Sequence, residues 1–135
     1  NNAFFAEMND VFINGQAAMI MNYFAFFPAL DNPGINPFAE VTGYFATPEG
    51  PYGDRFTSLG GQGLSVINYI SDERKQASLD FIKWFAQEEI QRQWAEVGGY
   101  TCNIAVLESE EFLTNTPYNP AFADSMRRSS PVRIP

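Results

Sequence analysis

Residues 60–100 read GGQGLSVINYISDERKQASLDFIKWFAQEEIQRQWAEVGGY and contain the clearest structural pattern in the chain. Within them, residues 65–70 mix β-branched and aromatic side chains, a composition typical of a strand. Ser71 or Asp72 can accept hydrogen bonds from the free amides at the start of the helix that follows. A second amphipathic segment ends at the glycine pair 98–99, because glycine readily adopts the left-handed conformation after a helix. The stretch therefore predicts a strand, two helices and glycine-rich turns, with no catalytic motif.

Two apolar stripes define the helices of this stretch. The first has helical spacing and consists of Ala77, Phe81, Trp84 and Phe85. The second lies on one side of the following segment and consists of Ile90, Trp94 and Val97. We expect both tryptophans to be buried in the core of this helix pair.

A helix and then a strand are predicted near the start of the chain. Residues 3–13 carry apolar side chains at helical spacing, and Asn14 with Gly15 ends that helix. The short apolar run 17–22 (AAMIMN) is more typical of a buried strand than of a helix at that length.

The segments between this strand and residue 60 include the most aromatic part of the chain. Residues 23–30 (YFAFFPAL) predict a short helix that Pro28 disturbs. Residues 41–46 have the composition of a further strand, and residues 47–56 that of a surface loop.

Two more helices are predicted after residue 100. Residues 107–113 form an acidic segment whose glutamates lie near its start, where the helix dipole favours them. Residues 121–128 form the last candidate helix. No internal repeat or linker divides the chain, so we predict one α/β domain over residues 1–135, with a small mixed sheet flanked by helices. The chain begins within a helical pattern and ends without a closing element, so we expect both ends to be internal to a longer protein.

Composition argues against several classes of function. The chain has 135 residues, of which 45% are hydrophobic and 16% aromatic, so it is long enough to bury a core. Its net charge of −8 argues against nucleic acids and anionic membrane surfaces, both of which attract clustered lysine and arginine. It has no histidine and a single cysteine, Cys102, which removes Ser-His triads, internal disulfides and Cys-rich metal sites. We expect no cofactor.

Adjacent carboxylates occur twice and raise the question of glycoside hydrolysis. The pairs are Glu88 with Glu89, and Glu110 with Glu111. Each pair lies at a predicted helix start, where acids are favoured electrostatically, and adjacent helix residues point in different directions. A hydrolase instead needs two carboxyl groups that flank one bond. We therefore expect no enzymatic activity.

Several groups of residues follow one another in a recognisable order. They are residues 12–19 (FINGQAAM), residues 60–63 (GGQG) before Ile67 and Asn68, Ala77 with residues 81–84 (FIKW), residues 89–91 (EIQ), and residues 98–100 (GGY) before Val106 and Leu107. This order resembles that of the extracellular solute-binding proteins of ABC importers, specifically the sugar-binding, maltose-binding-protein-like family. The resemblance extends from Phe4 to about Phe122.

The resemblance implies a two-lobed receptor that closes over a solute and presents it to the permease subunits of an ABC importer. This chain would be most of the C-terminal lobe, with the type II periplasmic-binding-protein-like fold and without the N-terminal lobe and the final helices. The solute would be a sugar or a related polar molecule. The location would be periplasmic or extracellular, and a membrane-attached lipoprotein is one form that the resemblance allows.

A sugar site needs flat aromatic rings for the apolar faces of the sugar and planar polar groups for its hydroxyls. The predicted ligand-binding residues are Asn22, Tyr23, Gly60, Gly61, Gln62 and Tyr100. For Asn22 and Tyr23 the alternative is a place in the core, and for Tyr100 it is a packing contact at a helix end. The glycines either let the backbone approach a ligand or form a bulge.

The aromatic segment 23–27 supports an alternative function as an interaction or structural module that packs on a partner protein. We expect Phe26 and Phe27 of this segment to lie in the core. Convergence of Tyr23, Gln62 and Tyr100 on one concave surface would favour the binding function. Exposed aromatic surface also predicts self-association of this chain, as a homodimer, because salt screens its net charge over about 8–10 Å.

Overall fold

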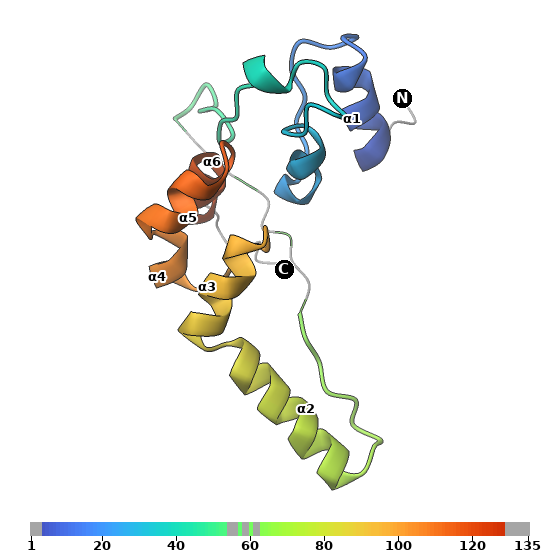
Figure 1. The fold of residues 1–135 in the computed structure, drawn as a ribbon, viewed down its shortest axis with the longest axis vertical. Helices are drawn as coiled ribbons and strands as arrows, with labels where there is room; N and C mark the ends of the chain where they lie inside the picture. The colour runs from blue at the N-terminus through green and yellow to red at the C-terminus, as the bar shows by residue number, and fades with distance from the viewer. Residues whose placement is uncertain (1–3, 54–56, 58–59, 61–62, 129–135) are drawn as a thin grey trace.

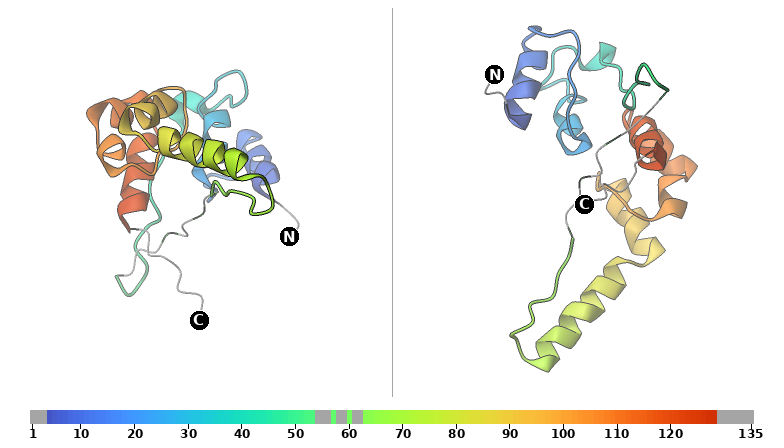
Figure 2. Two further views of the ribbon diagram at one scale, coloured as in Figure 1. Left: turned by 90° about the horizontal axis from the view of Figure 1, so that it is seen from below. Right: turned by 180° about the vertical axis from the view of Figure 1, so that it is seen from behind.

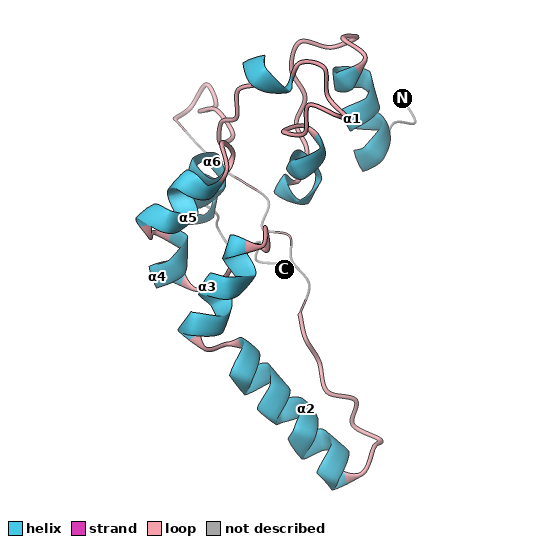
Figure 3. Cartoon of the chain, viewed as in Figure 1, coloured by secondary structure: helices cyan, strands magenta, loops and turns pink. Residues whose placement is uncertain are grey.

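The structure, a computed structural model, describes residues 4–53, 57, 60 and 63–128, and the regular elements in these ranges are helices (Figures 1 and 3). The α-helices are α1 (Phe5–Ile13), α2 (Asp72–Phe85), α3 (Glu88–Glu96), α4 (Ile104–Leu107), α5 (Glu110–Asn115) and α6 (Asn119–Arg128). Two 3-10 helices, η1 (Phe24–Ala29) and η2 (Ala39–Val41), lie between α1 and α2.

The molecule is elongated, with α3 to α6 packed in its middle (Figures 1 and 2). Helix α1 and η1 lie at one end, and α2 projects from the other end beside the segment that precedes it. The core is formed by Ala95 of α3, Val106 and Leu107 of α4, Phe112 of α5 and Ala123 of α6. The buried apolar side chains are thus concentrated in the middle, and the two ends are attached to it by aromatic contacts.

Short polar side chains set the starts of the central helices. The Asn103 side chain accepts a hydrogen bond from the Val106 amide at the start of α4. The Ser109 hydroxyl accepts one from the Phe112 amide at the start of α5. These caps satisfy amides that have no partner within the helix. Ser109 therefore starts a new helix inside the segment 107–113 for which the sequence predicts one helix.

A buried asparagine organises the loop between η1 and η2. Asn36 is completely buried. Its side-chain amide donates to the Leu30 carbonyl at 2.6 Å and to the Thr42 hydroxyl at 3.1 Å. Its carbonyl oxygen accepts from the Phe38 amide at 3.0 Å. One side chain thus supplies hydrogen bonds that a loop of this shape cannot make within its own backbone.

The predicted α/β fold, with a small mixed sheet flanked by helices, is wrong, because the described residues contain no strand (Figure 3). Residues 17–22, 42–46 and 65–70 are irregular, and Val41 is the last residue of η2. A strand needs a neighbouring strand to pair its backbone groups, and β propensity mainly reflects packing on a half-buried sheet. Here the side chains that would form the inner face are exposed, Tyr69 at 91%. The composition of one segment does not show whether a second segment is placed to pair with it.

The expectation that both tryptophans are core residues is also wrong. Trp84 is 47% exposed and Trp94 is 44% exposed. Helix α2 projects away from the core and meets α3 near its end, where the Phe85 and Trp94 rings are edge to face with centroids 5.8 Å apart. Only part of each apolar stripe is therefore covered.

The glycine turn after α3 has the predicted left-handed conformation. Gly98 has φ of +92°, and its amide donates to the Ala95 carbonyl at 3.0 Å. We expect Gly98→Ala to lower the free energy of unfolding by about 1–2 kcal/mol, because a side chain strains this conformation. Urea unfolding followed by circular dichroism measures the loss.

Gly43→Ala is the matched control for this turn. Gly43 has a negative φ, and a Cβ added there meets no atom within 4 Å. We expect no loss of stability for this variant. Equal losses for the two variants would contradict a specific requirement for glycine at position 98.

Candidate ligand-binding site

Tyr100 connects η1 to the central helices. Its ring packs against the Phe122 ring of α6 with centroids 4.7 Å apart, and the Phe24 ring meets Phe122 at 5.2 Å. The Tyr100 hydroxyl donates a hydrogen bond to the Phe24 carbonyl. Burial, together with the nearby Tyr118, raises the pKa of the Tyr100 hydroxyl above its usual value, so this donor stays protonated. We call Phe24, Tyr100 and Phe122 the aromatic junction.

Asn22 joins α1 to the start of η1. Its side-chain amide donates to the Phe5 carbonyl at 2.8 Å and to the Asn9 side-chain carbonyl at 2.9 Å. Its own side-chain carbonyl accepts from the Tyr23 amide at 2.9 Å. Both N–H donors of Asn22 are therefore used inside the molecule, and only its oxygen has room for a further hydrogen bond.

Asn9 is the residue of this region that sequence analysis missed. It is buried in α1, and its amide donates to the Phe26 carbonyl at 2.8 Å. The signal for it was present, because Asn9 lies four residues after Phe5 and three before Phe12 and thus shares their helix face. A polar residue on an apolar face needs an internal partner, and Asn22 provides it.

Tyr23 is the predicted site residue that remains accessible. It is 46% exposed, and its hydroxyl has no hydrogen-bond partner among the described residues. The Phe5 ring holds it in place from one side, edge to face with centroids 5.0 Å apart. Gly60 lies against the other part of the ring, where an added Cβ would be only 3.1 Å from Tyr23 Cε1. A glycine at position 60 thus allows the backbone to approach this ring closely.

Residues 22–24 bring four of the predicted site residues near one another. Asn22 and Tyr23 belong to this segment, Gly60 lies against the Tyr23 ring, and Tyr100 binds the Phe24 carbonyl. Gly61 and Gln62, the other predicted site residues, lie outside the described residues. Among the described four, only Tyr23 offers both an exposed ring and an uncommitted hydroxyl. Phe26 and Phe27, predicted to lie in the core, are partly buried and pack on Phe5 and Tyr44.

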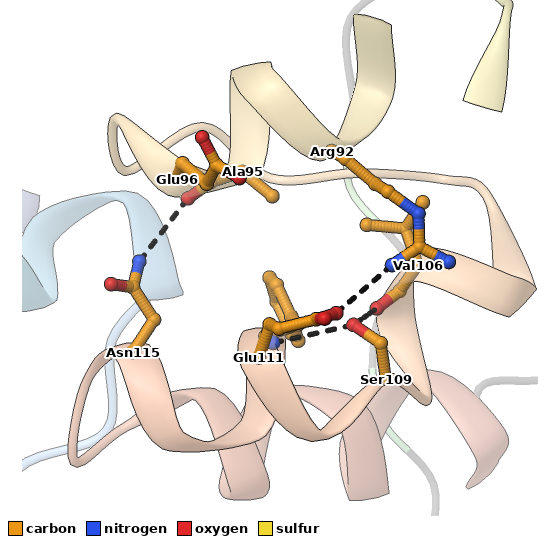
Figure 4. Close-up of a pocket in the computed structure, with 8 residues that line it drawn as sticks. Arg92, Ala95, Glu96, Val106, Ser109, Glu111 and Asn115 are labelled. Atoms are coloured by element: carbon orange, nitrogen blue, oxygen red, sulfur yellow. Dashed lines mark hydrogen bonds and ion pairs between the residues drawn. The ribbon is translucent and has the colours of Figure 1, made fainter. Parts of the chain in front are cut away.

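A hollow of about 450 Å³ lies between α3, α4 and α5 (Figure 4), and none of these residues is among those that line it. Arg92 spans its edge, with an ion pair to Glu88 at 2.8 Å and another to Glu111 at 3.0 Å. The residues that line the hollow are Arg92, Ala95, Glu96, Val106, Ser109, Glu111, Phe112 and Asn115. The Arg92 guanidinium is paired with both carboxylates, so the hollow presents no free cation to an anionic ligand.

The part of the chain that the structure describes contains no group of three or more acidic or cysteine side chains placed to hold a metal ion. None of its helices has the length and apolar character needed to cross a bilayer.

Comparison with protein families identifies the class to which the chain belongs. The model of the family described as bacterial extracellular solute-binding protein matches residues 2–121. The chain therefore belongs to this family, which supplies the substrate-binding components of ABC importers and is not enzymatic. No curated protein and no solved structure matches the chain.

Proposed function

We propose that this chain binds a sugar, or a similar polar solute, on the surface around Tyr23 and contributes to its delivery to an ABC permease. The chain would be one lobe, the C-terminal one, of a two-lobed receptor of the maltose-binding-protein-like type. Family membership supports solute binding in general. The observation that supports this location is the half-exposed Tyr23 ring, which contacts the Phe5 ring and Gly60. The side-chain oxygen of Asn22 is bonded to the backbone amide of the same tyrosine.

The chemistry of this surface suits a ring with one apolar face. A fixed aromatic ring can stack on the C–H face of a sugar, and rigidity lowers the entropy lost on binding. The Tyr23 hydroxyl and the Asn22 oxygen can exchange hydrogen bonds with ring hydroxyls. Asn9 and Phe5 act as positioning residues, because they hold Asn22 and Tyr23 in this arrangement. Tyr100 contributes through Phe24, since its own hydroxyl is committed.

Isothermal titration calorimetry with a panel of mono- and disaccharides tests this function. We expect binding by this chain only at millimolar sugar, because one wall of a cleft neither excludes water nor completes the hydrogen bonds. Tyr23→Ala should weaken binding of the best ligand about 2–12-fold, which corresponds to the about 0.5–1.5 kcal/mol of one aromatic contact. Tyr23→Phe should retain most of the affinity.

Tyr52→Ala is the control, since Tyr52 is an exposed tyrosine that makes no ring contact with the described part of the chain. It should bind as the original chain does. Micromolar binding by this chain alone would contradict a shared cleft. Equal affinities of the Tyr23→Ala and original chains would contradict the proposed site.

A further inference from the structure

Two polar side chains are buried where α3 meets the connection to α4. Gln91 of α3 is 6% exposed, and Thr101 of the connection is 2% exposed. We call them the buried pair. Neither residue lines the hollow between α3, α4 and α5. Replacing both partners of a buried hydrogen bond by apolar groups of similar shape can leave stability nearly unchanged, whereas a fully satisfied polar network makes its surroundings rigid. The buried pair therefore fixes a position more than it adds stability.

The hydrogen bonds of the buried pair form one continuous series. The Gln91 side-chain amide donates to the Phe85 carbonyl, at the end of α2, at 2.8 Å. The Gln91 side-chain oxygen accepts from the Thr101 hydroxyl at 2.9 Å. The same hydroxyl accepts from the Asn103 amide at 3.0 Å. Because Phe85 binds the donor of the Gln91 amide, the oxygen is directed at Thr101, and the backbone at residue 101 is held against α3.

The backbone is also held on the other side of Tyr100. The Gly99 amide donates to the Trp94 carbonyl at 2.8 Å, and a Cβ added to Gly99 would overlap the Trp94 ring. Tyr100 thus lies between two fixed residues, Gly99 before it and Thr101 after it. A tyrosine side chain has only two rotatable angles, so a fixed backbone places its hydroxyl within a small region.

We propose that Gln91 and Thr101 are positioning residues for the surface around Tyr23. The buried pair fixes the backbone of Tyr100, the Tyr100 hydroxyl holds the Phe24 carbonyl, and Phe24 directly follows Tyr23. The effect of the pair on affinity rests on the proposed solute binding at Tyr23, whereas its effect on the shape of this segment does not.

The hydroxyl of Tyr100 is needed in addition to the rings of the aromatic junction. Phe24 and Tyr100 both pack on Phe122, with centroids 5.2 and 4.7 Å away. Burial of apolar surface is non-directional and leaves the rings able to slide, whereas a hydrogen bond depends on distance and angle. The polar series from Gln91 to the Phe24 carbonyl therefore sets where the segment that carries Tyr23 lies.

Native-state hydrogen exchange at the Phe26 amide tests this role without any solute. The amide donates to the Tyr23 carbonyl at 3.0 Å, so its exchange reports on the segment that carries the proposed site. Thr101→Val keeps the shape of the side chain and removes its hydroxyl. We expect exchange at Phe26 to become about 2–12-fold faster, which corresponds to the loss of one hydrogen bond. Tyr100→Phe should have an effect of the same size.

A double variant tests whether the residues act in series. If Thr101 acts through the Tyr100 hydroxyl, Thr101→Val combined with Tyr100→Phe should exchange no faster at Phe26 than Tyr100→Phe alone. Effects that multiply in the double variant would show two independent contributions and would contradict the series.

Two further variants separate positioning from stability. Ser109→Ala removes the hydroxyl that accepts from the Phe112 amide, so it should lower the urea midpoint. It should leave exchange at Phe26 unchanged, because an amide that opens locally does not follow global stability. Gln91→Leu combined with Thr101→Val should keep a urea midpoint close to that of the original chain and still accelerate exchange at Phe26. Unchanged exchange in Thr101→Val, or equally faster exchange in Ser109→Ala, would overturn the proposal.

Calorimetry with the best sugar of the panel distinguishes a failure of this role from a failure of the proposed function. If Tyr23→Ala leaves the affinity unchanged but Thr101→Val accelerates exchange at Phe26, the proposed solute site is wrong and the positioning of the segment is supported. If Tyr23→Ala weakens binding but Thr101→Val changes neither affinity nor exchange, the solute site is supported and the positioning role is wrong. We expect both variants to weaken binding, Thr101→Val by the smaller factor, because it leaves the Tyr23 ring in place.

Discussion

Replacement of Phe112 by alanine should lower the free energy of unfolding by about 3–5 kcal/mol, the largest loss that we expect from a single change. Phe112 is 4% exposed and belongs to the core cluster between α3 and α6. Its ring also approaches Phe122 of the aromatic junction, with centroids 6.1 Å apart. Truncation removes apolar burial and leaves a cavity that rigid helices cannot close. A domain has a total stability of only about 5–15 kcal/mol, so this variant should be partly unfolded.

Thermal and urea unfolding, followed by circular dichroism, measure this loss. Phe45→Ala provides the matched control, because Phe45 is the same residue type but is 59% exposed in an irregular segment. We expect its effect to stay within about 0.5 kcal/mol. If the two variants unfolded at the same denaturant concentration, the core would not lie among α3 to α6.

Asn36→Ala should have the second largest effect, a loss of about 2–4 kcal/mol. The substitution leaves the Leu30 carbonyl, the Phe38 amide and the Thr42 hydroxyl without the side chain that binds all three. Buried polar groups without partners are costly, because the unfolded chain hydrogen-bonds them to water. The loop between η1 and η2 should also lose its shape, which hydrogen exchange at the Phe38 amide would report.

Asn14→Ala is the control for this loop. The Asn14 side chain makes one hydrogen bond to the Asp10 carbonyl at 2.8 Å, and Asn14 is exposed, so water can replace it. We expect a loss below about 0.5 kcal/mol. A similar loss for both asparagines would contradict the larger contribution that we expect from the buried hydrogen bonds of Asn36.

Helices were predictable from the sequence where local signals agree. Helix α2 begins at Asp72 directly after Ser71, but the Ser71 side chain makes no capping hydrogen bond, so the predicted side-chain cap is wrong for Ser71. Helix α3 ends before the left-handed Gly98, as predicted. Spacing, acidic first turns and a glycine stop all lie within one segment, so no distant residue is needed to interpret them. The division of the predicted helix 107–113 into α4 and α5 was missed, although the capping residue Ser109 is visible in the sequence.

Strands and burial were not predictable in the same way. Residues 17–22 have an apolar composition, but a strand exists only when another segment pairs with it. The exposure of Trp84 and Trp94 likewise depends on where α2 points, which the amphipathic pattern does not contain. An amphipathic pattern identifies the side of a helix that can be buried, but it does not determine which segment covers that side.

The residue types of the candidate site were predictable from the sequence, but the hydrogen-bond partners of each side chain were not. A polar residue beside an aromatic one, Asn22 with Tyr23, suggested a ligand contact. In the structure the Asn22 donors bind Phe5 and Asn9, which lie far from it in sequence. The role of Tyr23 in binding stays a prediction, which the calorimetric comparison tests.

The aromatic junction has a consequence for the order of folding. The Tyr100 hydroxyl and the Phe24 carbonyl are 76 residues apart in the chain, whereas α3 to α6 are joined by short connections. Closing so long a loop costs entropy before any contact compensates it, so local helix pairs should form first. The surface around Tyr23 would then become native late in folding. In native-state hydrogen exchange we expect the Phe26 amide, bonded to the Tyr23 carbonyl, to open more readily than the core amides of α6.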